Sequence, residues 1–380
     1  MSAGEIDPNV ELLPDVPIAG PEEDLFDRTR VAQRLGELAT AGPVTAPRLV
    51  ALTGDSGAGK SSVLRIVTAQ LGAQAGIALL AFDATSSPTA LAVTATLANE
   101  LARLFEALGV VEAKDKIRNT LTSYGGIVSG VAKLVGVKVD VAGALERSAD
   151  SLRNEIAGNL EQLGKRLVIV IDHLDRLPAS ELGSVLTALR MYAAIPYASM
   201  VIALDRRTTT LREAATPGAD PTAFERLVQV ELALPAPDRV LLARVLAGGL
   251  ERIATRTRRD LDAALPLFDP DGGLALALIE TPRDAKRAAN ALAAALPLAA
   301  ADADLSALTL EIVLRVLVPE VDAARLAARD RIADRPGLYA ELAAGVNPRR
   351  RTAAAREALR ELVLGDQASA ASSSSIASPQ

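Results

Sequence analysis

The sequence predicts an α/β fold in which a doubly wound parallel sheet is followed by a C-terminal helical domain. Five apolar runs typical of buried strands lie between residues 47 and 235, and helical patterns separate most of them. The strand pattern stops after Pro237, where Ala-, Leu- and Arg-rich helices take over. Alternation of strands and helices favours a parallel sheet covered by helices, and the change after Pro237 indicates a second, all-helical unit.

The predicted strands are short apolar runs bounded by glycine or charge. The first run, PRLVALTG, ends at Gly54, and the third, RLVIVID, is apolar almost without interruption, as expected of a strand covered on both faces. The runs occupy residues 47–54, 76–85, 166–172, 198–205 and 226–235. Apolar residues at helical spacing predict helices at residues 31–39, 61–71, 89–108 and 149–163.

Composition along the chain predicts four parts. Residues 1–23 are rich in Pro, Asp and Glu and form an extended lead-in. Residues 24–236 form the α/β core, with an insertion at about 109–148 where glycines break any steady period. Residues 237–365 form the helical domain, and residues 366–380 have too little apolar surface to fold and form a disordered tail.

The composition also excludes several kinds of site. The chain has no cysteine, which excludes disulfides, thiol nucleophiles and Cys-type zinc sites, and its single histidine excludes a His-based metal cluster. A net charge of −6 argues against sequence-independent adhesion to DNA. The start, MSAGEIDPNVELLPD, lacks the basic and apolar regions of a secretory signal, so we expect a cytoplasmic location.

The insertion raises the question of membrane contact. Its longest uncharged run, residues 119–132, is 14 residues long, which is shorter than the roughly 18 to 20 residues needed to span a bilayer. Lys133, Lys138 and Asp140 interrupt the sequence after this run. No transmembrane segment is predicted; the insertion is either a subdomain or lid, or an amphipathic segment that makes a peripheral membrane contact.

The motif GDSGAGKSS, which comes after the first strand and opens a helix, predicts a phosphate-binding loop. Its glycines let the chain turn tightly, so that backbone N–H groups and a helix N-terminus converge on one anion. Lys60 would lie against the β- and γ-phosphates, and the Ser61 hydroxyl would be a ligand of Mg²⁺. The predicted nucleotide-binding residues are Gly54, Asp55, Ser56, Gly57, Ala58, Gly59, Lys60, Ser61 and Ser62.

A carboxylate at the end of a neighbouring strand would complete such a site, because Mg²⁺ needs a second anchor and hydrolysis needs a polarised water. Asp172 directly ends the run RLVIVID and is the predicted second metal ligand. Asp175 is a candidate to orient the attacking water, and Arg176 to pair with it or with phosphate. A local solvated ion pair is the alternative for both residues.

The motifs GDSGAGKSSVL, VIVIDHLDRLP, VIALD, ERLVQVELALP and TPRDAKRAANAL resemble, in this order, the KAP family of P-loop NTPases over residues 15–298. The resemblance implies an ASCE/AAA-like fold, ATP and Mg²⁺ as ligands, and ATP-driven switching in membrane-linked signalling or in defence against phage. One position departs from the family pattern, since His173 stands where an acidic residue is expected. An imidazole offers no fixed negative charge, so hydrolysis is expected to be slow: either Asp175 serves as the base, or the protein binds ATP more readily than it cleaves it. A purely structural His173, hydrogen-bonded at the sheet edge, is the alternative.

Other charged residues are candidate reporters of the γ-phosphate. By resemblance, Asp205 corresponds to a polar sensor, with a plain strand-end cap as the alternative. Arg283 and Arg287 share one helix face, and Arg283 is the predicted sensor from the helical domain, against a solvated basic face. Arg226 is a candidate arginine acting in trans. The basic run at residues 347–351 has no interleaved aromatics and gives no strong nucleic-acid signal.

These observations leave three functional hypotheses. The first is an ATPase switch, in which ATP docks the helical domain through an arginine and an unnamed protein partner reads the change. The second is a nucleotide-binding scaffold with little or no turnover. The third is a kinase, which the phosphate loop alone permits but which fits Asp205 and the TPRDAKR helix poorly. Self-association is left open.

Overall fold

The computed structural model describes residues 12–86, 89–110, 140–206, 223–257, 260–300, 302–319 and 323. Most of the predicted insertion lies outside these residues, as do the predicted tail at 366–380 and the basic run at 347–351. The chain divides into two compact units, one formed by Pro17–Pro235 and the other by Met1–Val16 with Ala236–Gln380. Among the described helices, none is both long enough and apolar enough to cross a bilayer.

The first unit is built on a five-stranded parallel sheet with the strand order β2-β3-β4-β1-β5. Because β4 lies between β1 and β3, strands that are distant in sequence end side by side at one edge of the sheet. This architecture confirms the predicted α/β fold. The strands are β1 (Arg48–Thr53), β2 (Ile77–Asp83), β3 (Arg166–Asp172), β4 (Ala198–Leu204) and β5 (Val230–Ala233).

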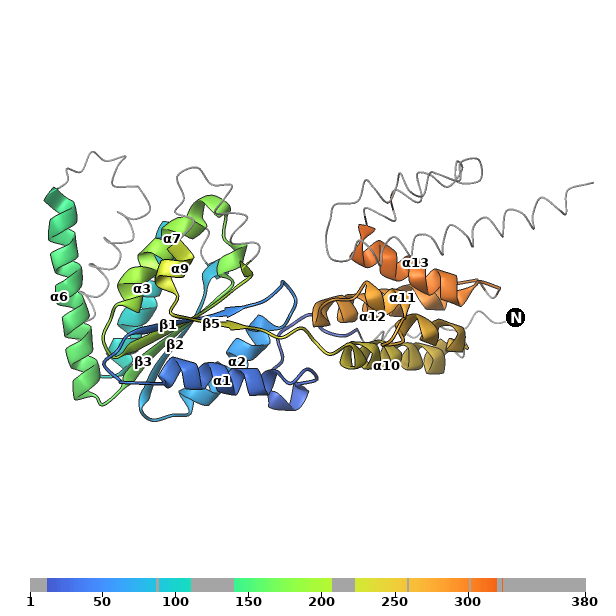
Figure 1. The fold of residues 1–380 in the computed structure, drawn as a ribbon, viewed down its shortest axis with the longest axis horizontal. Coiled ribbons are helices and arrows are strands. Elements are labelled where there is room, and N and C mark those ends of the chain that lie inside the picture. Colours follow the sequence, from blue (N-terminus) through green and yellow to red (C-terminus); the bar gives the residue numbers. More distant parts are fainter. Residues whose placement is uncertain are drawn as a thin grey trace, which may run out of the picture. The chain divides into compact units, whose positions relative to one another are not determined.

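Helices cover both faces of the sheet, so the α/β unit is doubly wound (Figure 1). Side chains alternate along β1: Val50 and Leu52 pack with the helices of one face, while Leu49 and Ala51 pack with those of the other. The first face carries α1 (Arg28–Thr40) and α2 (Lys60–Gly72), and the second carries α3 (Ala90–Ala107), α6 (Asp140–Gln162), α7 (Ala179–Ala193) and α9 (Ala223–Leu227). Short 3-10 helices are η1 (Pro21–Glu23), η2 (Ala84–Ser86) and η3 (Leu174–Arg176).

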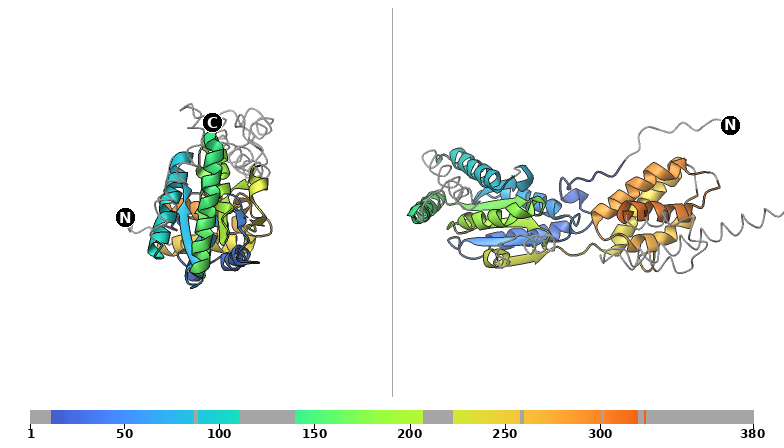
Figure 2. Two further views of the ribbon diagram at one scale, coloured as in Figure 1. Left: turned by 90° about the vertical axis from the view of Figure 1, so that its left-hand side faces the viewer. Right: turned by 90° about the horizontal axis from the view of Figure 1, so that it is seen from above.

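The second unit is helical in its described part, as predicted for the chain after Pro237. In its core, helix α12 packs against both α10 and α13 (Figure 2). Helix α12 begins with a capping box, in which the Thr281 hydroxyl accepts from the N–H of Asp284 and the Asp284 carboxylate accepts from the N–H of Thr281. The elements are α10 (Arg239–Thr257), η4 (Asp262–Phe268), α11 (Leu274–Ala277), α12 (Pro282–Ala295), η5 (Leu296–Leu298) and α13 (Leu305–Leu317).

The start of α1 is fixed by Asp24, three residues before Asp27, the residue that precedes the helix. The Asp24 carboxylate accepts hydrogen bonds from the N–H groups of Arg28 at 2.9 Å and Thr29 at 2.6 Å, and from the Thr29 hydroxyl at 2.7 Å. Burial acts to raise the pKa of Asp24, but these hydrogen bonds outweigh it and hold the pKa below its ordinary value of 3.8. Asp24 therefore supplies the cap of α1, while Asp27, in the left-handed region at φ 54°, makes no side-chain cap.

We predict that Asp24→Asn lowers the free energy of unfolding by about 1 to 2 kcal/mol at neutral pH, because an amide cannot accept all of these bonds. The same change at Asp27 is the control and should cost about 0.5 kcal/mol or less. Because the folded-state pKa of Asp24 is depressed, its stabilisation is present above the ordinary pKa and is lost as the pH falls through the depressed value. Denaturant titrations across pH test this prediction. It would be contradicted if the difference in unfolding free energy between wild type and Asp24→Asn did not become smaller below pH 3.8.

Candidate nucleotide-binding site

The predicted phosphate loop joins the end of β1 to the start of α2. Gly57 and Gly59 lie in the left-handed region, at φ 84° and φ 103°, where side chains with a Cβ are strained. Within the loop the N–H of Ala58 donates to Asp55 O at 3.1 Å, and the N–H of Val63 donates to Gly59 O at 3.1 Å. The loop is thus a tight turn that opens directly into a helix, which is the arrangement that binds phosphate.

Lys60, the first residue of α2, lies inside this loop. Only 8% of the residue is exposed, and its ammonium donates to the carbonyl oxygens of Gly54 at 2.8 Å and Asp55 at 3.2 Å. The Nζ atom lies 3.7 Å from Oδ2 of Asp175, a residue that comes shortly after β3. A buried ammonium is therefore held where the loop meets a carboxylate that follows β3, and phosphate oxygens would compete with the two carbonyl groups for it.

Asp172 is the last residue of β3, as the sequence predicts, and the chain turns sharply after it. His173 adopts the left-handed conformation at φ 62°, which is uncommon for a residue other than glycine. Its N–H donates to Asp172 Oδ1 at 2.8 Å, and the chain continues into η3. The turn directs the His173 ring back over the end of the sheet, toward the phosphate loop.

The His173 ring links three elements of the site. Nε2 lies 3.2 Å from Ser61 Oγ and 3.6 Å from Asp172 Oδ2, and Nδ1 lies 3.1 Å from Asp83 Oδ2. When Nδ1 carries the proton and donates to Asp83, Nε2 of the neutral ring accepts from the Ser61 hydroxyl. Donation to His173 leaves the Ser61 oxygen with lone pairs for a cation, so both predicted metal ligands, Ser61 and Asp172, border the same imidazole.

Asp83 is the residue of this group that the sequence analysis missed. It ends β2 and is paired in register with Asp172 across the sheet. Burial acts to raise the pKa of Asp83, but hydrogen bonds from Thr85 and the nearby His173 outweigh it and lower the pKa. A signal was present, since Asp83 ends an apolar run in the same way as Asp172 and Asp205.

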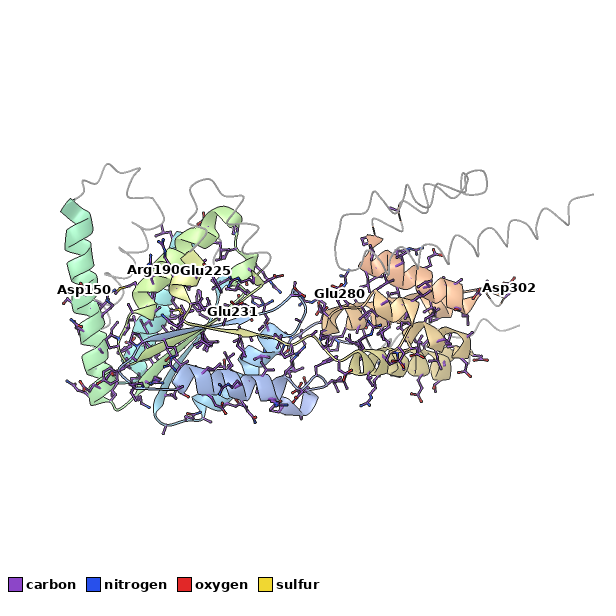
Figure 3. The ribbon with its side chains drawn as sticks, viewed as in Figure 1. Asp150, Arg190, Glu225, Glu231, Glu280 and Asp302 are labelled. Carbon is purple, nitrogen blue, oxygen red and sulfur yellow. The ribbon has the colours of Figure 1, made fainter. Side chains whose placement is uncertain are left out.

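The end of β4 joins the site through the main chain. The N–H of Asp205 donates to Asp175 Oδ2 at 3.1 Å, so Asp175 contacts both this strand end and Lys60. The next residue, Arg206, points elsewhere: it pairs with Glu231 at 2.7 Å and Glu225 at 3.5 Å, two residues labelled in Figure 3. Asp172, Asp175 and Asp205 therefore gather at the carboxyl edge of the sheet, where ligands of α/β proteins bind.

Two of the predicted arginine sensors, Arg283 and Arg287, belong to the helical unit, and the candidate trans-acting arginine, Arg226, belongs to the α/β unit. Arg283 belongs to α12 of the helical unit, where its Nε donates to Asp15 Oδ1 at 2.9 Å. Arg287 donates to the carbonyl of Val316 at 3.0 Å. Arg226 lies on α9 of the α/β unit. Their proposed roles toward the γ-phosphate stay predictions.

The donor set fits a magnesium nucleoside triphosphate. A glycine loop, a buried ammonium and a helix N-terminus suit the phosphates, and a hydroxyl with the carboxylate that ends β3 suits Mg²⁺, which keeps few protein ligands. A parallel sheet with this loop after β1 and a carboxylate after β3 defines a P-loop NTPase, for which nucleotide and Mg²⁺ binding are implied.

Within this class the chain belongs to the KAP family: it matches the KAP family P-loop domain over residues 30–299. It is also 25% identical over 189 residues to the phage T7 exclusion protein of Escherichia coli (strain K12), a match that covers 45% of this chain and 24% of that protein. The chain therefore spans about a quarter of the length of that relative.

Similar solved structures include two proteins of Aeropyrum pernix. The ORC1 protein in complex with DNA is 18% identical, with a TM-score of 0.39 over 92% of this chain and 86% of that chain. The ORC2 protein is 14% identical, with a TM-score of 0.35 over 90% of this chain and 95% of that chain. Likeness at these TM-scores supports no inference about function.

We predict that Gly59→Ala destabilises the α/β unit by about 1 to 3 kcal/mol, because the backbone at φ 103° strains a residue with a Cβ. An added Cβ would also lie 3.4 Å from Arg28 Nε. Gly158→Ala within α6 is the control: its Cβ would have no atom within 4 Å, so the change should stabilise by about 0.5 to 1 kcal/mol. Denaturant unfolding measures both, and equal stability of the two variants would contradict the prediction.

Proposed function

We propose that this protein binds and hydrolyses Mg-ATP, and that the reaction drives a conformational switch in an assembly that limits phage growth. The observation that carries the proposal is the 3.7 Å approach of Lys60 to Asp175. It brings the phosphate loop and the end of β3 into one buried site, which hydrolysis requires and a solitary phosphate loop would not supply.

The loop residues would hold the phosphates. Backbone N–H groups of residues 57–62 would surround the anion, and Lys60 would exchange its bonds to Gly54 O and Asp55 O for bonds to phosphate oxygens. The glycines permit this approach because Gly57 and Gly59 have no Cβ to fill the space.

Ser61 and Asp172 would hold the metal, which when bound neutralises negative charge on the phosphates. His173 keeps Ser61 in place through the hydrogen bond to its hydroxyl, and Asp83 keeps His173 in place in turn. This chain of contacts supports a role of His173 in positioning a metal ligand, at a position where the family pattern has an acidic residue.

Asp175 would accept a proton from the attacking water. It is largely buried, with its side chain 13% exposed, and is oriented by the N–H of Asp205 and by Lys60.

A scaffold that binds nucleotide with little turnover is the second candidate function. His173 favours it, because an imidazole bonded to Ser61 and Asp83 places no fixed negative charge beside the γ-phosphate. Under this function, ATP would order the α/β unit and leave it unchanged until exchange.

We predict that wild-type protein with Mg-ATP releases phosphate, and that Lys60→Ala and Asp175→Ala each lower the rate about a hundredfold or more, because each removes a charged group from the reacting site. Lys165→Ala is the control, since the Lys165 ammonium donates to Ala75 O outside the site and its loss should leave the rate near that of wild type. Phosphate release at a range of ATP concentrations measures this. A wild-type rate equal to that of Lys60→Ala, with ATP still bound, would leave only the scaffold function.

We also predict that phage T7 forms plaques less efficiently on cells that express the wild-type chain than on cells that express Lys60→Ala. The reason is that the phage T7 exclusion protein of Escherichia coli is a relative and the phosphate site would drive the response. Plating efficiency at matched expression measures this. Equal plating on the two strains would contradict the defence role while leaving the nucleotide chemistry intact.

A further inference from the structure

Arg28, the first residue of α1, is a buried cation beside the phosphate loop. Only 4% of the residue is exposed. Its Nη2 donates to the carbonyl of Ala58 in the loop at 2.9 Å, and its Nη1 donates to the carbonyl of Pro235 at 3.1 Å. One guanidinium therefore spans the loop and the chain after β5, two segments about 180 positions apart in sequence.

The fit of Arg28 is tight on the loop side. A Cβ added at Gly59 would lie 3.4 Å from Nε, an atom that is buried without a hydrogen-bond partner. Asp24 accepts from the backbone N–H of Arg28, while the guanidinium donates to the two carbonyl groups. Burial disfavours the charge of Arg28 and the nearby carboxylates of Asp24 and Asp27 favour it, and an anion bound in the adjacent loop would favour it further.

Pro235 has a particular place in the chain, because it is the last residue of the α/β unit before the chain continues into the helical unit. The preceding residue is also tied to the loop: a Cβ added at Gly54 would lie 3.1 Å from Leu234 Cβ, and the N–H of Leu234 donates to Thr53 O at 2.7 Å. Movement of the loop would therefore displace residues 234–235.

The other connection between the units leaves the α/β unit from the same region. The chain passes from Val16 to Pro17 there. The Pro17 carbonyl accepts from Arg65 of α2 at 3.1 Å, and the N–H of Ile18 donates to Ser62 Oγ, one residue after the predicted metal ligand, at 3.3 Å. Both connections thus start at residues that are hydrogen-bonded either to Arg28 or to α2, the helix that follows the phosphate loop.

We propose that Arg28 is a positioning residue that sets the shape of the phosphate loop and couples its occupancy to Pro235, where the chain leaves for the helical unit. The coupling to Pro235 rests on the proposed nucleotide binding, whereas the effect of Arg28 on the shape of the loop does not. Arg28 holds the Ala58 carbonyl turned away from the phosphate position, so that the N–H groups of the loop face the anion. When phosphate pulls on the loop, the shared guanidinium passes the displacement to Pro235.

The test uses the full chain and compares Arg28→Lys and Arg28→Met with a control, Arg34→Met, on the exposed face of the same helix. Hydrogen exchange of residues 54–60 is measured first without nucleotide, well below the melting temperature of the least stable variant. Affinity for a fluorescent ATP analogue with Mg²⁺ is measured next, and then the nucleotide-dependent change in exchange at Leu234 and Ala236.

For Arg28→Met we expect loop exchange about tenfold faster and affinity about 10- to 100-fold weaker, because two carbonyl groups lose a charged donor. Nucleotide should slow exchange at Leu234 and Ala236 in wild type and in Arg34→Met but not in Arg28→Met. Arg28→Lys keeps the charge and one bond, so it should fall between. A merely structural role would lower the melting temperature of the Arg28 variants without changing these comparisons.

Loop exchange and affinity in Arg28→Met within about twofold of Arg34→Met would overturn the proposal. If Arg28→Met does not fold, Arg28→Lys decides: wild-type exchange and affinity in that variant overturn it, and intermediate values support it. If wild type binds no ATP, the proposed function fails, yet loop exchange without nucleotide still tests whether Arg28 sets the loop.

Discussion

The approach of the Lys60 ammonium to the Asp175 carboxylate, buried at the carboxyl edge of the sheet, is the interaction on which the site depends. It exists because the strand order places β4 between β1 and β3, so that the loop after β1 meets the chain after β3 across a single strand. Asp205, which follows that intervening strand, donates its N–H to Asp175 and so helps to orient the Asp175 carboxylate. Separating the two charges would leave an unpaired charge in a site of low dielectric constant, which is unfavourable. The positions of the loop and of the strand ends are therefore fixed relative to one another.

Around this pair lie polar side chains that are hydrogen-bonded to one another. Asp83 holds His173, and His173 holds Ser61, while the left-handed turn at His173 makes the geometry possible. This network is only partly buried, since the side chain of Asp83 is 52% exposed and that of His173 is 19% exposed, so each hydrogen bond in it contributes less than it would in a fully buried network. Arg28 supports the loop through a different kind of contact, because it bonds to a backbone carbonyl instead of a side chain. The phosphate loop is thus supported both by side chains at the sheet edge and by a cation hydrogen-bonded to its backbone.

Much of this could be predicted from local patterns. The apolar runs and the GDSGAGKSS motif were enough for the parallel sheet, the helical unit and a phosphate loop, and Asp172 stands where a strand-end carboxylate was expected. What local patterns could not supply are contacts between distant residues. Ser61 and His173 are 112 positions apart, and Asn290 pairs with the backbone of Leu13 across 277 positions, which brings the N-terminal segment onto α12. Arg28 carried no signal either, because nothing in a run of charged residues marks which one is buried.

Calorimetric titration with ATP, in the presence and absence of Mg²⁺, tests most directly whether the loop and the strand-end acid form one magnesium triphosphate site. Wild type should bind ATP more tightly with Mg²⁺ than without it, and Asp172→Asn should abolish that difference while keeping the metal-independent binding that Lys60 and the loop provide. Absence of heat from wild type under both conditions, or an undiminished effect of Mg²⁺ in Asp172→Asn, would contradict the account.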